Sequence, residues 1–424
     1  MGAEKVIPGI KCELRKRARG DRVVRGIAAL AVISFFVGFV LLTAPSGKND
    51  TKRSLDFTEF YVAGQMVREG MGGRLYDLGL QAEKQSLVAP IHAFYLRPPF
   101  EAILFIPLTF VAYRTAYAIW VLVSVGLLAG ACFLIVRITG VAEAVSQYTR
   151  GIIVDFGLLL VIFLTFGPSF NCLLIGQDTM LLLMVYTLVF IALKSRRDFA
   201  AGGLLACGLF KFHLVVPFVI IFMIRRRWRF LTGFAVVGGL LMLISVLVSG
   251  WGVFNSYAGM FLNSKYRFLM GFEPQYAANI RGLVYLLAGE RVPVIVSFAL
   301  VVSLSVVLLW IVARRWENED CGLSFSAGLL GTVLTGYHLF IYDLTLLLLA
   351  VAITCGELAR RRTLLGQRSL AVILVIFFVP PLHYLLTVEH MYALMSIPVA
   401  VLLGINLREA EKSNVLLPRE VESV

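Results

Sequence analysis

Residues 293–313 read PVIVSFALVVSLSVVLLWIVA, a run of 21 residues without a charge. At a rise of about 1.5 Å per residue, a helix of this length matches the roughly 30 Å hydrocarbon core of a bilayer. Backbone groups in lipid must be satisfied within the segment, so this run is expected to form a transmembrane helix. Comparable uncharged runs lie at residues 27–44, 115–136 and 230–248.

The composition of the whole chain agrees with these runs. Of its 424 residues, 59% are hydrophobic and only 15% are charged, whereas soluble domains are about 25% charged. A soluble protein this apolar could not cover its surface with polar groups. The chain is therefore expected to be an all-α integral membrane protein that crosses the bilayer several times.

The net charge of +13 does not indicate a nucleic-acid-binding protein, because the Lys and Arg residues cluster at the borders of the apolar runs. The positive-inside rule distributes cations in this way. Residues 1–25 carry eight Lys or Arg against three acids, which places the N-terminal tail in the cytoplasm. The first apolar run then acts as a retained signal anchor, because it exceeds the usual 7–15 residues of a signal peptide's apolar region, at about 18.

The charge pattern predicts about 12 spans within a transmembrane domain at 26–407, followed by a cytoplasmic tail at 408–424. Three basic clusters, at 225–229, 314–315 and 360–362, mark the cytoplasmic side of the second half. Its spans are expected at 230–250, 293–313, 322–338, 343–357, 369–386 and 391–406. The stretch 251–292 is then a second large external loop, and both termini of this multi-pass protein of the cell (inner) membrane are cytoplasmic.

The first half allows two arrangements. Spans at 99–112, 115–136, 151–168, 178–194 and 200–224 complete the count of twelve, but they leave the cluster Lys194–Arg197 outside, against the charge rule. A re-entrant hairpin at 200–224 would put the cluster inside, and 99–112 could then not cross fully. The twelve-span arrangement is the prediction adopted.

The first external loop is expected at 45–98. Its apolar and polar residues suit a short amphipathic helix at the membrane interface, ended by the glycines at 70–73. Asp56 stands just before this helix. It could cap the helix N-terminus, or act as a general base that takes a proton from an acceptor hydroxyl; the two roles are compatible.

Two cations lie where a lipid phosphate could meet them. Arg97 precedes Pro98-Pro99 at headgroup level, where it could bind phosphate or simply snorkel. Lys211 interrupts an apolar stretch, and an ionisable residue at that depth is a functional-site hypothesis unless it is a boundary residue in a turn. Gly176-Gln177-Asp178 is a similar polar interruption, interpreted as a plain turn.

Further candidates lie near the outer face in the second half. Arg281 belongs to the 251–292 loop, where it is either a phosphate ligand or a solvated charge. His338, Tyr342 and Asp343 lie where a span meets the outer face, either as a site or as a structural pair of His and Asp.

The six cysteines are scattered without a C-x-x-C pair, so neither a metal knuckle nor a disulfide framework is indicated. Nucleotide-binding and zinc-protease motifs are absent from the sequence.

Four stretches, in order, resemble the GT-C-type glycosyltransferases and specifically glycosyltransferase family 87, the polyprenol-phosphate-mannose-dependent mannosyltransferase-like proteins. They extend from about residue 54 to residue 350, and one departure is Lys211-Phe212 where the family usually has Lys-Pro. The four stretches are Asp56–Tyr61 with Leu75–Asp77; Tyr95–Phe100 with Phe105–Pro107 and Ala118–Trp120; Gly176-Gln177 with Ala201-Gly202 and Gly208–Lys211; and His338 with Tyr342-Asp343-Leu344.

The resemblance implies a hexosyltransferase that moves a sugar, with mannose the first expectation, from a polyprenyl-phosphate donor to a hydroxyl of a lipid or glycan acceptor. Reaction on the external face would invert the anomeric carbon, with Asp56 accepting the proton. Cations among Arg97, Lys211, Arg281 and His338 would stabilise the polyprenyl phosphate leaving group, and Tyr342 and Asp343 would complete the substrate site. No cofactor and no metal is required, although His338 and Asp343 leave a metal open. The expected partners are the donor, the acceptor and membrane lipids.

Two other functions fit parts of the sequence. A transporter or flippase of a lipid-linked sugar would also place Lys211 and polar interruptions at membrane depth, but the two halves show no convincing internal repeat. A non-catalytic scaffold of the cell envelope would tolerate the loss of Asp56.

Overall fold

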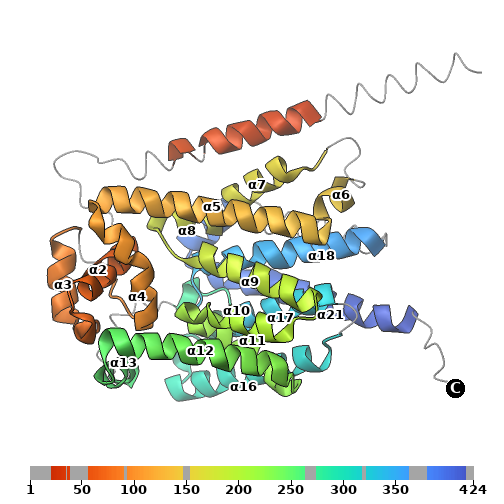
Figure 1. Cartoon of the computed structure of the whole chain (residues 1–424). Helices are drawn as coiled ribbons and strands as arrows, with labels where there is room; N and C mark the ends of the chain where they lie inside the picture. The colour runs from red at the N-terminus through yellow and green to blue at the C-terminus, as the bar shows by residue number, and fades with distance from the viewer. Residues whose placement is uncertain are drawn as a thin grey trace, which may run out of the picture.

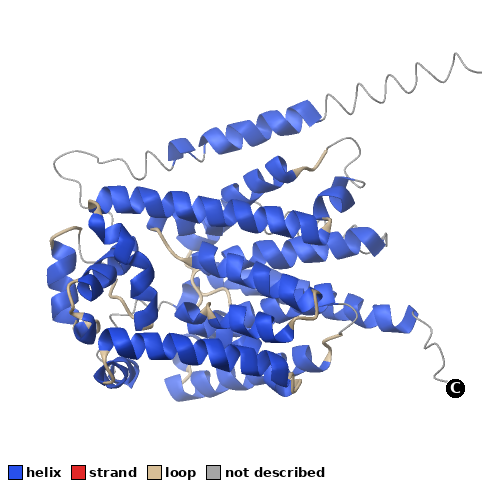
Figure 2. Ribbon diagram, in the orientation of Figure 1, coloured by secondary structure: helices blue, strands red, loops and turns tan. Residues whose placement is uncertain are grey.

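A computed structural model of the chain describes residues 21–34, 36–38, 56–89, 93–146, 153–262, 274–317, 321–361 and 380–416. Throughout these residues the protein is helical, and they contain no strand (Figure 2). The cytoplasmic-tail predictions for 1–20 and 417–424, the loop residues 45–55 and 263–273, and most of the predicted 369–386 span lie outside the described residues.

Residues 21–34 and 36–38 are helical, and the chain then forms the helices shown in Figure 1. The first half contains α2 (Phe57–Arg68), α3 (Leu78–Ser86), α4 (Pro99–Phe105), α5 (Tyr113–Thr139), α6 (Val141–Ser146), α7 (Phe156–Thr165), α8 (Gly167–Ile175), α9 (Thr179–Lys194), α10 (Asp198–Ala206) and α11 (Phe212–Ile224). The second half contains α12 (Trp228–Ser249), α13 (Gly252–Leu262), α15 (Ile280–Ala288), α16 (Val294–Arg314), α17 (Cys321–Thr335), α18 (Leu347–Arg361), α20 (Pro380–Val388) and α21 (Ser396–Leu416). Short 3₁₀ turns join several of them: η1 (Gly72–Arg74), η2 (Ile106–Phe110), η3 (Leu209–Lys211), η4 (Pro274–Tyr276), η5 (Gly289–Arg291), η6 (Ile341–Leu346) and η7 (Tyr392–Met395).

The described residues contain fewer membrane-length helices than the predicted twelve. Five are long and apolar enough to span a bilayer: Tyr113–Thr139, Trp228–Ser249, Val294–Arg314, Ile341–Arg361 and Tyr392–Lys412. Two bent pairs, α7 with α8 and α10 with η3 and α11, raise the number to seven if each counts as one span. The predicted spans at 99–112, 178–194 and 322–338 are only 10–17 residues long as helices, too short to cross a roughly 30 Å core unless the bilayer is locally thinned. Twelve spans are therefore not confirmed.

Basic turns gather at one end of the bundle, where α5 and α9 finish and α12 begins (Figure 1). Lys194 Nζ donates to the Ile138 carbonyl at 2.9 Å, at the end of α5. Arg225 Nη1 donates to the Trp316 carbonyl at 2.8 Å, just beyond the end of α16. These contacts join turns that are far apart in sequence, so they form one basic end of the bundle.

The Lys194–Arg197 cluster belongs to this same end, which corrects the arrangement adopted from the sequence. Arg227 Nη2 lies 2.7 Å from Asp198 Oδ2, so the turn after α9 lies beside the turn before α12. The segment between them, α10 to α11, therefore starts and finishes at one end, as in the re-entrant alternative. Consistent with that alternative, the segment at 99–110 is a short α4 that continues into the 3₁₀ turn η2.

Helices α2, α3 and α4 form a compact group at the opposite end of the bundle (Figure 1). Phe57, Phe60 and Met66 of α2 are fully buried, together with Phe105 of α4. A Cβ on Gly64 would lie 2.9 Å from the Phe105 carbonyl carbon, so only glycine allows the two helices to approach this closely. Nine of the 12 residues of α2 are buried, so the helix packs within the protein, whereas an amphipathic surface helix was predicted.

Candidate active site

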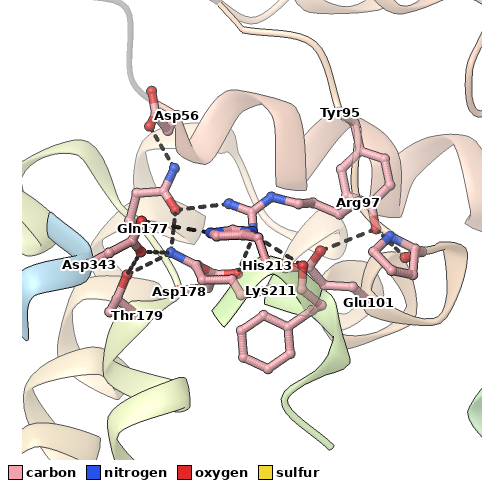
Figure 3. Close-up of polar contacts among 12 residues, drawn as sticks. Asp56, Tyr95, Arg97, Glu101, Gln177, Asp178, Thr179, Lys211, His213 and Asp343 are labelled. Carbon is pink, nitrogen blue, oxygen red and sulfur yellow. Dashed lines mark hydrogen bonds and ion pairs between the residues drawn. The ribbon is translucent and has the colours of Figure 1, made fainter. Parts of the chain in front are cut away.

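The start of α2, the loop before α4, the turn between α8 and α9, and the turns η3 and η6 meet where the α2–α4 group joins the bundle (Figure 3). Gly176, which ends α8, makes part of this junction, with φ +73°, a left-handed conformation that favours glycine. A Cβ there would lie 2.7 Å from Phe57 Cβ, so the residue also allows the start of α2 to approach. The turn thus places Gln177 next to Asp56, and Asp178 next to Arg97 and Lys211.

Asp56 does not cap its helix with its side chain. It occupies the N-cap position of α2, but its carboxylate accepts no hydrogen bond from the first-turn amides. Instead Gln177 Nε2 donates to Asp56 Oδ2 at 2.6 Å. Asp56 is partly exposed while Gln177 is 1% exposed, so a buried amide holds a carboxylate that remains open on one side.

Gln177 carries the connection from Asp56 to the cations. Its Oε1 accepts a hydrogen bond from Arg97 Nη2 at 3.2 Å and one from Lys211 Nζ at 3.5 Å. An amide that donates to a carboxylate and accepts from cations fixes its own orientation, since its two ends have opposite polarity. Asp56, Arg97 and Lys211 are therefore linked through one side chain.

Lys211 is fully buried, at 0% exposure. Its Nζ lies 2.6 Å from Asp343 Oδ1 and 2.9 Å from Asp178 Oδ1, and it donates to Thr179 Oγ1 at 2.7 Å. It also lies 4.6 Å from the centre of the Tyr342 ring. The ammonium is thus enclosed by its own counter-charges, which is the arrangement a buried charge requires.

Arg97 is the more accessible cation, with 15% of its side chain exposed. Its Nη1 lies 3.4 Å from Asp178 Oδ2 and 3.3 Å from the Phe210 carbonyl, and its guanidinium lies over the Phe60 ring at 5.6 Å. Loop, turn and α2 thus fix the planar group in one place, as a group that binds phosphate oxygens in a defined geometry requires.

A histidine pair extends this network toward Arg281. His213 Nε2 lies 4.0 Å from Asp343 Oδ2, and the rings of His213 and His338 are 5.9 Å apart. Arg281 donates to the Tyr337 carbonyl at 3.2 Å and lies over the Tyr337 ring at 4.4 Å. Burial, with a smaller contribution from His213, lowers the pKa of His338 well below its usual value, so this imidazole is neutral near pH 7 in the protein alone.

The structure thus brings together five of the seven predicted site residues directly: Asp56, Arg97, Lys211, Tyr342 and Asp343. His338 joins the group indirectly, because its ring lies beside that of His213. Arg281 is farther away: its described contacts are with Tyr337, the residue before His338. Sequence reasoning interpreted Gln177-Asp178 as a plain turn and did not consider Glu101 or Thr179. The signal was present in Asp178, a charge between two strongly apolar segments.

Glu101 is a further buried carboxyl beside this network, at 0% exposure. Its Oε2 accepts from the Tyr95 hydroxyl at 3.5 Å, and its Oε1 has no hydrogen-bond partner. In the part of the chain that the structure describes, no group of three or more His, Cys, Asp or Glu side chains could hold a metal ion.

The model of glycosyltransferase family 87 matches residues 95–341, more than half of the chain. The chain belongs to glycosyltransferase family 87. This is consistent with a GT-C-type membrane glycosyltransferase. The match includes Arg97, Lys211, Arg281 and His338. No curated protein and no solved structure matches the chain.

Proposed function

We propose that this glycosyltransferase moves a hexose, mannose first among the candidates, from a polyprenyl phosphate to a hydroxyl of a lipid or glycan acceptor. The observation that carries the proposal is the link Asp56–Gln177–Arg97. It holds a partly exposed carboxylate and a partly exposed guanidinium through one buried amide. A base for the attacking hydroxyl and a cation for the departing phosphate are the two groups that such a transfer needs.

The reaction proceeds by displacement at the anomeric carbon. The acceptor oxygen attacks that carbon while its proton passes to the Asp56 carboxylate, and a new glycosidic C–O bond forms. The bond from the anomeric carbon to the phosphate oxygen breaks with its electron pair, and polyprenyl phosphate leaves. Arg97 faces the charge that develops on the leaving oxygen, and attack from the opposite side inverts the configuration.

The external face of the cell membrane is the proposed location of this chemistry. Basic turns gather at the end of the bundle opposite the α2–α4 group, and the positive-inside rule makes a basic end cytoplasmic. Asp56 and Arg97 then lie on the outer side, near the headgroups, where a polyprenyl-linked sugar can present its phosphate while its tail remains among the helices.

The test is transfer from radiolabelled polyprenyl-phosphate-mannose to a panel of glycolipids by the purified protein in nanodiscs, compared with Asp56→Asn. Asparagine keeps the shape, and the Asp56 side chain makes no cap hydrogen bond that could be lost, so the fold should persist. Removing a general base should lower the transfer rate about 10²–10⁴-fold. Donor binding should survive. A variant that transfers at the wild-type rate would exclude Asp56 as the base.

A second candidate function, a flippase of a lipid-linked sugar, is favoured by one observation. The segment Asp198–Ala206 is bent by 63° against Leu209–Ile224, and Lys211 lies in the turn η3 just after the break; transporters use broken helices of this kind around their substrates. Movement of a fluorescent polyprenyl-phosphate-sugar across proteoliposomes without sugar transfer would support the flippase and count against the transferase.

A further inference from the structure

Glu59 lies one helical turn beyond Asp56 in α2. The Glu59 amide donates to the Asp56 carbonyl at 3.1 Å, so the two residues share the first turn of the helix. Residues three apart on a helix have Cβ atoms about 5–6 Å from each other and lie on one face. The second carboxyl therefore stands beside the proposed base.

The Glu59 side chain is buried without a protein partner. It is 6% exposed, and among the described residues it makes no hydrogen bond or ion pair. Buried polar groups in native proteins are normally paired. A group kept in this state next to an active site is explained if a ligand supplies its partner.

The surroundings of Glu59 belong to the same site. The charged groups that act on its carboxyl are Arg97, Asp56, Asp178 and Lys211. Burial raises the pKa of Glu59 well above its usual value, and the Arg97 charge opposes the rise only in part. Burial therefore favours the neutral form of this carboxyl. A neutral carboxyl can both donate and accept a hydrogen bond, which suits a hydroxyl partner.

We propose that Glu59 binds a second hydroxyl of the acceptor, next to the one that Asp56 deprotonates. The acceptor class is then a sugar or cyclic polyol with neighbouring hydroxyls, and a simple lipid alcohol is excluded. This inference rests on the proposed function and deepens it. Glu59 is assigned binding and not proton removal, because burial raises the pKa of its carboxyl and disfavours the charged form that a general base needs.

The experiment compares acceptors that differ by one oxygen. The donor is polyprenyl-phosphate-mannose, and the probes are octyl α-mannoside and its four monodeoxy analogues. For the wild-type protein, deleting the hydroxyl next to the accepting one should lower kcat/KM about tenfold or more, because Glu59 loses its partner. Glu59→Ala should bring that ratio close to one, with most of the change in KM. Glu59→Gln, which keeps a donor and an acceptor, should retain most of the discrimination.

Asp56→Asn is the matched control from the same helical turn. It should slow transfer to the parent and the deoxy acceptors alike and leave their ratio unchanged. Discrimination by Glu59→Ala equal to that of the wild type would overturn the inference while leaving the transferase proposal intact. Complete failure of the wild-type protein to transfer mannose to any octyl mannoside or glycolipid would instead remove the proposed function and, with it, the inference.

Discussion

Replacing Lys211 with methionine tests whether the buried ammonium holds the site together. Its Nζ lies 2.6 Å from Asp343 and 2.9 Å from Asp178, and the side chain is 0% exposed. Methionine fills a similar volume without a charge, so two buried aspartates lose their shared cation. We expect a less stable protein, since an uncompensated buried charge is strongly unfavourable.

The loss of stability in Lys211→Met depends on the partners that each aspartate retains. Removing one partner of a buried ion pair destabilises a protein by about 3–5 kcal/mol. Asp178 retains Arg97, with Nη1 at 3.4 Å. Asp343 retains His213 at 4.0 Å and two neutral donors, Thr179 Oγ1 at 3.1 Å and the Phe340 amide at 3.0 Å. Asp343 therefore suffers the larger share of the loss.

Unfolding by SDS in mixed micelles, followed by tryptophan fluorescence, measures these differences. Lys211→Met should be the least stable variant. Adding Asp343→Asn should recover most of the lost free energy, and adding Asp178→Asn should recover less. If the single variant is as stable as the wild type, or if Asp178→Asn gives the better rescue, the electrostatic account of Lys211 is wrong.

Two further predictions concern positioning and packing. Gln177→Leu removes the 2.6 Å hydrogen bond to Asp56 and the 3.2 Å hydrogen bond from Arg97, so kcat should fall about 10- to 100-fold, as expected for a hydrogen bond to a charged group. Unchanged unfolding in SDS would exclude a general loss of fold. Gly233→Ala in α12 should lower stability by about 1–3 kcal/mol, because its Cβ would lie 2.0 Å from the Phe199 carbonyl oxygen. Gly239→Ala in the same helix meets no atom within 4 Å and should be neutral or stabilising; equal losses in SDS unfolding would contradict the packing explanation.

The sequence predicted the helical membrane architecture because long apolar runs have few structures open to them in lipid. Three of the four quoted runs correspond to α5, α12 and α16. Shorter apolar runs were misjudged, since composition does not tell a span from a re-entrant helix. The position of Lys194–Arg197 at the basic end of the bundle is seen from tertiary contacts such as the ion pair between Asp198 and Arg227. Hydropathy does not encode such contacts.

The site was predicted in part for a related reason. A charge in an apolar stretch marked Lys211 as unusual, but no pattern in the sequence identifies the partners of this side chain. Asp178 and Asp343 are separated by 165 positions and meet only because α8, η3 and η6 converge. From the sequence, Asp56 could be a helix cap or a base. In the structure its carboxylate points toward Gln177 and makes no cap hydrogen bond, which the sequence could not predict.

The arrangement of charges in the site indicates which cation would contact the phosphate of the proposed donor. Lys211 is enclosed by two aspartates and has no exposed surface, so a phosphate could reach it only by displacing one of them. Arg97 is partly exposed and shares Asp178 with Lys211. Lys211 thereby weakens the hold of Asp178 on Arg97 and leaves the guanidinium more of its charge for an incoming anion. On this argument Lys211 acts on the phosphate through Asp178, and Arg97 is the cation that meets it. Arg281, also partly exposed, is the second candidate for direct contact.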